Sequence, residues 1–189
     1  MVKAIRPVSE KKPVHFTWLD SGERSHRKPK TATRGNEVRL DEKEYLWLEK
    51  GMRSLGLFAK LNLRNLATLL PYMRLFSFPK GSVVCREGDP GDSFFLIYRG
   101  GVDVTKSTGI FSGSPIRLAR LQSGDFFGEL ALLLNQPRSA TCVATKESRI
   151  FVLKYDDFRR ILEKHPVVLR KVRKVGEQRM RQLTKAWAH

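Results

Sequence analysis

Two opposite charges, Glu129 and Arg138, enclose a short apolar run in the stretch FGELALLLNQPRSAT, which covers residues 127–141. A guanidinium offers a planar set of N–H donors that suits a phosphate group. A carboxylate only accepts hydrogen bonds, so it suits a hydroxyl group. Together, the two residue types suit a ligand that carries both a phosphate and a free hydroxyl.

The position of this stretch supports a ligand site. It lies between two runs with strand character, IRLARL and TCVAT, so a short helix interrupts a series of strands. The first backbone N–H groups of such a helix have no partner within it, and Gly128 leaves room for an anion to approach them. With Glu129 accepting from a ribose 2′-hydroxyl and Arg138 neutralising a phosphate, the stretch suits a 3′,5′-cyclic nucleotide.

A simpler explanation of Glu129 and Arg138 is a surface ion pair. The helix dipole alone favours Glu in a first turn, and an exposed pair contributes only about 0 to 1 kcal/mol. For an isolated Glu and Arg nine positions apart, this explanation would be preferred. The complete stretch, set between strands, favours the ligand site instead.

Helices are predicted before the strands. Asp41 and Glu44 have the D-x-x-E spacing of a capping box, and they precede an amphipathic pattern that Gly56 can end. Asn62 can cap a second helix that runs to Leu70.

Short strands follow from Phe76 onward, where the apolar pattern changes its period. Several runs with strand character are separated by turn signals such as Gly-Asp-Pro-Gly-Asp and Gly-Gly. Asp156 or Asp157 then caps a helix, and Pro166 separates this helix from a last, basic one. The order predicts an α+β protein in which an antiparallel β jelly-roll barrel is flanked by N-terminal and C-terminal helices.

Charge and periodicity divide the chain into four segments. The formal net charge is +17, and much of the excess falls near the two ends of the sequence. Residues 1–40 lack a periodic apolar pattern, so we expect a basic, disordered arm. An N-terminal helical segment (41–75), a β-barrel (76–155) and C-terminal helices (156–189) follow.

Two features of the sequence indicate the cellular compartment of the protein. Cys85 and Cys142 both fall within strand-like runs, which favours packed, reduced thiols over a disulfide framework. No signal peptide is visible, and the longest apolar run is too short to span a bilayer. We therefore expect a cytoplasmic protein, whose basic segments could also meet an acidic membrane surface.

The sequence offers little for catalysis or for a metal. His15 and His26 lie in the arm, His165 precedes a proline and His189 is terminal, so no histidine falls on a predicted strand. There is no Ser-His-Asp set, phosphate-binding Walker loop or pair of catalytic carboxylates. We therefore expect a binding protein without a cofactor, and not an enzyme.

The stretch FGELALLLNQPRSAT closely resembles the phosphate-binding cassette of the cyclic nucleotide-binding domain family. That family includes regulatory subunits of cAMP-dependent protein kinase, cGMP-dependent kinases, cyclic nucleotide-gated channels and bacterial catabolite activators. The stretch FPKGSVVCREGDPGDSFFLIYRGGVDV is similar to the family's opening strands and glycine turn, and the resemblance covers roughly residues 40–187. It implies a receptor module that binds a cyclic nucleotide and transmits occupancy through its flanking helices. The resemblance also implies that the β-barrel (76–155) holds the phosphate-binding cassette and that the last segment (156–189) forms hinge and lid helices.

The resemblance also implies a role for each matching residue. Glu129 would accept a hydrogen bond from the ribose hydroxyl, and Arg138 would bind the cyclic phosphate. Gly91 and Asp92 match a loop that packs near Arg138, and a lid would come from the helix that begins near Val167. The other ligand-binding residues would present backbone N–H groups or lie beside the phosphate and the base: Gly128, Leu130, Ala131, Ser139 and Ala140.

Several questions stay open at the level of sequence. The hydroxyl of Ser139 can donate to a phosphate or to a guanine edge, so cAMP is favoured while cGMP stays compatible. Leu169, Val172 and Val175 suit ordinary core packing as well as a lid over the base.

The sequence also leaves open which macromolecule responds to ligand binding. Occupancy would be read by an effector protein or domain that this sequence does not encode. A nucleic-acid-binding regulator is the alternative that the basic charge suggests. Bacterial activators carry a helix-turn-helix after the long helix, and we see no room for one here, so nucleic acid is not the partner that we favour.

Overall fold

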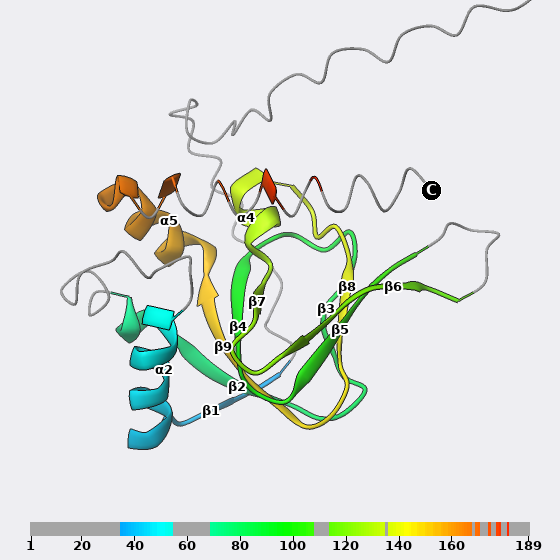
Figure 1. Cartoon of the computed structure of the whole chain (residues 1–189), viewed down its shortest axis with the longest axis horizontal. Helices are drawn as coiled ribbons and strands as arrows, with labels where there is room; N and C mark the ends of the chain where they lie inside the picture. The colour runs from blue at the N-terminus through cyan, green and yellow to red at the C-terminus, as the bar shows by residue number, and fades with distance from the viewer. Residues whose placement is uncertain are drawn as a thin grey trace, which may run out of the picture.

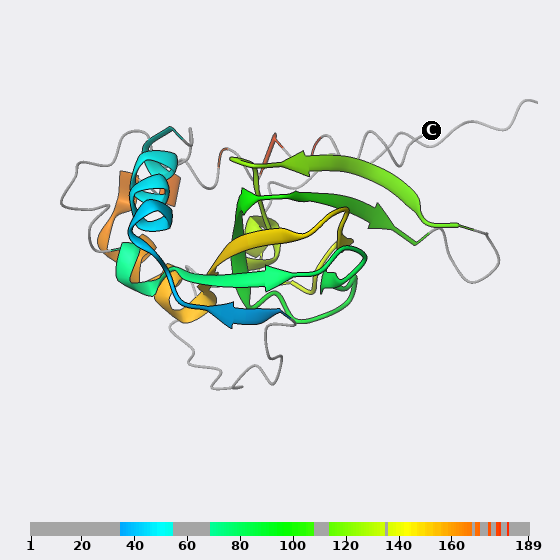
Figure 2. The same ribbon diagram turned by 90° about the horizontal axis from the view of Figure 1, so that it is seen from below.

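Two antiparallel sheets, flanked by helices on one side, form the described part of the protein (Figures 1 and 2). The computed structural model describes residues 35–54, 69–107, 114–134, 136–167, 169, 170, 174, 177, 178 and 181. The strands are β1 (Asn36–Val38), β2 (Arg74–Phe78), β3 (Val83–Cys85), β4 (Ser93–Arg99), β5 (Gly101–Lys106), β6 (Ile116–Gln122), β7 (Phe126–Phe127), β8 (Thr141–Ala144) and β9 (Ser148–Lys154). The helical elements are α2 (Glu42–Ser54), the 3₁₀ turn η1 (Leu70–Tyr72), α4 (Glu129–Leu134) and α5 (Tyr155–Lys164).

The jelly-roll fold predicted from the sequence is confirmed, with one refinement. One sheet has the strand order β1-β2-β9-β4-β7, and the other has the order β3-β8-β5-β6. Side chains from both sheets share a hydrophobic core, so the sheets pack face to face. In the described part of the chain, hydrogen bonds do not close the two sheets into one continuous barrel, so the body is a sandwich.

The five-stranded sheet is buried on both faces. Side chains of a strand alternate between the faces of its sheet. On β4, Phe95 and Ile97 therefore join the core between the sheets, whereas Phe94 and Leu96 join a second core that contains residues of α2, η1 and α5. Burial on both faces explains why the sequence of β4 is an almost continuous apolar run instead of an alternating one.

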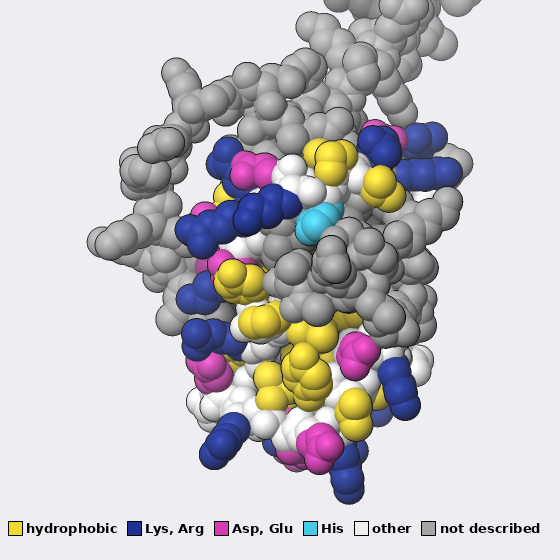
Figure 3. Space-filling model, turned by 90° about the vertical axis from the view of Figure 1, so that its left-hand side faces the viewer, with side chains coloured by type: hydrophobic (Ala, Val, Ile, Leu, Met, Phe, Trp, Pro, Cys, Tyr) yellow, Lys and Arg dark blue, Asp and Glu magenta, His cyan; other side chains and the backbone are white. Residues whose placement is uncertain are grey.

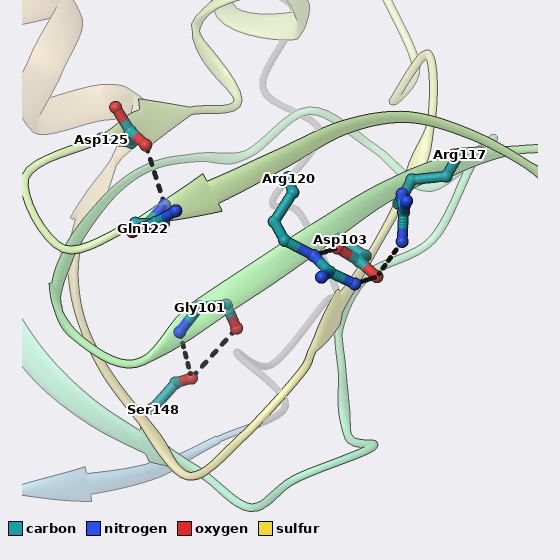
Figure 4. Close-up of polar contacts among 7 residues, drawn as sticks. All are labelled: Gly101, Asp103, Arg117, Arg120, Gln122, Asp125 and Ser148. Atoms are coloured by element: carbon teal, nitrogen blue, oxygen red, sulfur yellow. Dashed lines mark hydrogen bonds and ion pairs between the residues drawn. The ribbon is translucent and has the colours of Figure 1, made fainter.

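The four-stranded sheet has one buried face and one solvent-exposed face. On β5, Val102 and Val104 face the core between the sheets, while Asp103 lies on the other face, directly opposite Arg120 of β6. Arg120 donates two hydrogen bonds to the Asp103 carboxylate, at 2.8 and 3.0 Å, and Arg117 lies 3.7 Å from it (Figure 4). These contacts, led by the hydrogen bonds from Arg120, lower the pKa of Asp103.

The predicted capping box at the start of α2 is confirmed. The N–H of Glu44 donates to Asp41 Oδ1 at 2.7 Å, and the N–H of Asp41 donates to Glu44 Oε2 at 3.1 Å. The buried Glu44 carboxylate also pairs with Arg149 of β9. Because Leu48 and Met52 lie in the core below it, α2 is fixed to the five-stranded sheet by both its cap and its apolar face.

The start of the folded part differs from the prediction. Strand β1 lies within residues 1–40, which we assigned to the arm, and it pairs with β2 in antiparallel register. A strand of three residues is too short for an alternating pattern to be visible in the sequence. The sheet therefore includes residues before Leu40. Most of the predicted helix from Asn62 lies outside the described residues, and its last two residues, Leu69 and Leu70, form a turn and the start of η1.

The start of α5 also differs from the prediction. The helix begins at Tyr155, with Lys154 at the N-cap and no capping hydrogen bond from a side chain, so the predicted cap by Asp156 or Asp157 was wrong. The N–H of Tyr155 instead donates to the carbonyl of Asp92 at 2.8 Å. Both aspartates lie in the first turn, where the helix dipole favours negative charge.

The face that carries α2 and α5 mixes apolar and basic side chains (Figure 3). Tyr45, Leu46 and Tyr72 are its large exposed hydrophobic residues on α2 and η1. Elsewhere, Cys85 and Cys142 are free and buried, as the sequence predicted. Within the described ranges, no helix combines the length and the apolar character that a bilayer-spanning segment needs.

Candidate functional site

Gly128 joins β7 to α4 and has a conformation that other residues rarely adopt. Its φ is +86°, in the left-handed region. A side chain at this position would place its Cβ 2.7 Å from Nη1 of Arg138 and 2.9 Å from the carbonyl oxygen of Ser93. Glycine is therefore required here for two reasons, the backbone turn and the close approach of Arg138.

The side chain of Arg138 is buried against β4 and the start of α4. Its Nη1 donates to the carbonyl of Gly128 at 3.1 Å, and its Nη2 donates to the carbonyl of Ser93 at 2.7 Å. The carboxylate of Asp92 lies 3.4 Å from Nη2. With 4% of this side chain exposed, a full positive charge is held almost out of water.

Aromatic rings form one wall around this charge. The guanidinium carbon of Arg138 lies 5.1 Å from the ring centroid of Phe95, within the range of a cation–π contact. The Phe95 ring stacks on Phe127 with centroids 4.8 Å apart. An apolar wall lowers the local dielectric, so the positive field of Arg138 acts more strongly on an anion than it would in water.

The loop before β4 holds the main chain of Arg138. The N–H of Arg138 donates to the carbonyl of Asp89 at 2.7 Å, and the N–H of Gly88 donates to the carbonyl of Arg138 at 2.9 Å. Gly91 approaches Ala131 of α4 so closely that a Cβ there would overlap the alanine side chain. The expectation that this loop packs near Arg138 is confirmed through Asp92, while Gly91 lies against Ala131 and the carbonyl oxygen of Gln136.

The other predicted site residues lie on either side of Arg138 along the chain. Glu129 is 1% exposed and stands in the first turn of α4. Because Arg138 is buried as well, the two do not form an exposed ion pair, and the surface explanation is wrong. Ala131 and Ala140 are buried, while Leu130 and Ser139 are half-buried.

One pair of residues at the site was missed by the sequence analysis. Nζ of Lys106 donates to the carboxylate of Glu87 at 2.8 Å and to the carbonyl oxygen of Ser139 at 3.0 Å. Burial acts to raise the pKa of Glu87, but the hydrogen bonds from Lys106 and Ser107 outweigh it and lower the pKa. The signal in the sequence was the alternation of β5, which places Lys106 on the same face as Val102 and Val104.

The predicted hinge and lid are described only in part. Phe158 of α5 is buried and stacks on Phe94 with centroids 5.6 Å apart, so the first helix after β9 packs on the five-stranded sheet. Leu169 packs against the same core, as ordinary packing predicts. Val172 and Val175 lie outside the described residues.

Metal ligands do not gather in the described part of the chain. Among these residues, no three His, Cys, Asp or Glu side chains come close enough together to hold a metal ion. The charged groups at the site are Arg138, Glu129, Asp92 and the pair formed by Lys106 and Glu87.

Fold and site together define a class of jelly-roll domain in which a short helix interrupts the strands beside a buried arginine. Residues 75–165 match the family model of the cyclic nucleotide-binding domain. The resemblance to this family that the sequence predicted is confirmed over this range, which is slightly less than half of the chain. The matched range includes Glu129, Arg138 and the other predicted site residues.

Named proteins with similar sequences include a potassium channel and a kinase regulatory subunit. A cyclic nucleotide-gated potassium channel of Rhizobium etli is 34% identical over 123 residues, which are 65% of this chain and 32% of the channel. A cAMP-dependent protein kinase regulatory subunit of Pyricularia oryzae is 40% identical over 96 residues, covering 51% of this chain and 23% of the subunit. The chain thus spans a third or less of the length of these curated relatives.

Solved structures agree with this assignment. The regulatory domain of Toxoplasma gondii PKA, in a co-crystal with cAMP, superposes with a TM-score of 0.63 at 27% sequence identity. The similarity covers 71% of this chain and 51% of that chain.

The first prediction concerns Gly128. Gly128→Ala would cost about 1 to 2 kcal/mol for the positive φ and a further 1 to 3 kcal/mol, roughly, for displacing Arg138 and the Ser93 carbonyl. Gly124→Ala is the matched control, because Gly124 has a φ of +90° but no atom within 4 Å of its Cβ position. Urea denaturation should show a clearly larger loss of stability for Gly128→Ala. Equal losses of stability would mean that the position of Arg138 does not require glycine at position 128.

Proposed function

We propose that this chain is a receptor module for a 3′,5′-cyclic nucleotide, with cAMP favoured and cGMP compatible. The observation that carries the proposal is the buried guanidinium of Arg138, which is held over an aromatic wall beside the start of α4. A cyclic phosphate has one negative charge and acceptor oxygens, so it complements a guanidinium in a site of low dielectric. The names of the similar channel and kinase subunits support the same ligand class.

Glu129 would give the site its selectivity for a ribose ring. A carboxylate accepts hydrogen bonds, and the 2′-hydroxyl of a cyclic nucleotide is a donor that could reach the first turn of α4, where Glu129 stands. Gly128, Leu130 and Ala131 would contribute backbone N–H groups or close approach, and Ser139 and Ala140 would lie beside the phosphate and the base. The ligand would be bound and released without chemical change.

Occupancy would reach the helices through Asp92. Its carboxylate lies 3.4 Å from Arg138, and its carbonyl accepts a hydrogen bond from the first N–H of α5. A phosphate that draws Arg138 toward itself would therefore change the balance of contacts at the start of α5. An effector protein or domain would read this change, and the free, buried cysteines suit a cytoplasmic receptor.

The second prediction tests the proposal through Arg138. Arg138→Ala would leave the phosphate without its counter-charge, a loss on the order of 2 to 5 kcal/mol in a desolvated site. Calorimetric titration should therefore show that the parent binds cAMP and cGMP and that the affinity of the variant is lower by tens to thousands of times. The parent should bind 5′-AMP poorly, because 5′-AMP lacks the cyclic phosphodiester.

Arg120→Ala is the control for this experiment. It removes an arginine that is about half exposed and paired with Asp103 on β5, and it should leave the affinity for cAMP unchanged. If Arg138→Ala bound cyclic nucleotides as well as the parent did, the site would be elsewhere.

The third prediction concerns the base. If the Ser139 hydroxyl donates only to phosphate, Ser139→Ala should weaken cAMP and cGMP equally, by roughly 0.5 to 1.5 kcal/mol. If the hydroxyl reads guanine, the same variant should weaken cGMP alone. Improved binding of both nucleotides in the same titrations would exclude either role.

A further inference from the structure

Lys106 is a charged residue on the inner face of the four-stranded sheet. Alternate residues of a strand share a face, and Val102 and Val104 of the same strand pack against the core between the sheets. The register of β5 with β8 is unbroken from Val102 to Thr105, so Lys106 continues this inner row at the end of the strand. Its side chain is only 27% exposed. A lysine in such a position needs polar partners for its ammonium group.

The partners of Lys106 come from two other segments. Nζ donates to Glu87 in the loop after β3, at 2.8 Å, and to the carbonyl oxygen of Ser139, which follows Arg138, at 3.0 Å. The other oxygen of the Glu87 carboxylate accepts from the N–H of Ser107 at 3.0 Å. One ammonium group therefore joins the end of β5, the loop after β3 and the chain beside Arg138.

The same loop holds this part of the chain at other points. The N–H of Glu87 donates to Oγ1 of Thr141 at 3.0 Å. Further hydrogen bonds join the peptide groups of Arg138 to Gly88 and Asp89. The contact with Lys106 carries a full charge, as does the ion pair between the side chains of Arg138 and Asp92, and charge-assisted hydrogen bonds are stronger than neutral ones.

We propose that Lys106 is a positioning residue of the cyclic nucleotide site, which holds the Ser139 carbonyl beside Glu87 and thereby keeps Arg138 oriented for the phosphate. The proposal rests on the function proposed above. Without the ammonium group, the Glu87 carboxylate would keep its hydrogen bond from the N–H of Ser107, but it would lose the donor that links it to the Ser139 carbonyl. In a fraction of the molecules, residues 138–141 would then move out of the arrangement that binds the ligand. The apparent affinity would fall in proportion to the fraction of molecules that keep this arrangement.

The fourth prediction is measured first without ligand, by amide hydrogen exchange. In Lys106→Met, which removes the charge and keeps the length of the side chain, the N–H groups of Arg138, Gly88 and Glu87 should exchange faster than in the parent. Lys106→Arg keeps a cationic donor and should restore most of the protection. Lys80→Met, which removes an exposed lysine in the turn after β2, should leave these amides unchanged. Unchanged exchange in Lys106→Met would overturn the proposal.

The same variants are then titrated with cAMP by calorimetry. If about one molecule in ten keeps the arrangement that binds the ligand, Lys106→Met should bind cAMP roughly tenfold more weakly than the parent. Lys106→Arg should bind cAMP with an affinity close to that of the parent. In an Arg138→Ala background, titrated into the millimolar range, the change at Lys106 should have little further effect, because the guanidinium that it positions is gone. A full additional loss in that background would mean that Lys106 attracts the phosphate directly, and would overturn the positioning role.

Failure of the two proposals can be told apart. A parent protein that binds neither cAMP nor cGMP would contradict the proposed function, and the positioning role would fall with it. A parent that binds, together with a Lys106→Met variant of equal affinity, would contradict the positioning role alone.

Discussion

The buried guanidinium of Arg138 is the constraint on which the site depends. A charge that is almost out of water must be surrounded by acceptors, and here the carbonyls of Gly128 and Ser93 and the carboxylate of Asp92 provide them. Each acceptor belongs to a different part of the fold: the entry of α4, the first residue of β4, and the loop before it. The jelly roll brings these parts together, because β7 pairs with β4 next to the entry of α4.

This arrangement connects the site to the hydrophobic cores on both faces of the five-stranded sheet. The inner face of β4 supplies Phe95, the ring that lies under Arg138, while the outer face of the same strand supplies Phe94, which stacks on Phe158 of α5. Asp92 contacts Arg138 through its side chain and the first turn of α5 through its carbonyl. Arg138 and α5 are therefore joined by two short sets of contacts, one through β4 and one through the loop that precedes it.

The sequence predicted the parts of the structure whose signals are local. The capping box at Asp41 and Glu44 and the cassette at residues 127–141 have fixed spacings of particular residue types, so they could be recognised directly. Strand β1 and the cap of α5 were missed because a three-residue strand has no period, and because an aspartate near a helix start can act through the dipole without capping it.

The role of Lys106 was missed for a different reason. Its contacts join residues that lie 19 and 33 positions apart in the sequence, and no local pattern encodes them. The alternation of β5 indicated the inner face, but only the fold shows that Ser139 and Glu87 lie there. Long-range hydrogen bonds of this kind depend on strand order and register, which a single sequence does not specify.

We propose that Arg138 and Glu129 divide the ligand between them, with Arg138 binding the phosphate and Glu129 accepting from the ribose hydroxyl. The most direct measurement compares cAMP with 2′-deoxy-cAMP in the parent and in Glu129→Ala by calorimetric titration. We expect the parent to bind 2′-deoxy-cAMP more weakly than cAMP, and Glu129→Ala to bind the two ligands with nearly equal affinity, because the acceptor for the hydroxyl is then absent. An undiminished preference for cAMP in Glu129→Ala would contradict this role of Glu129.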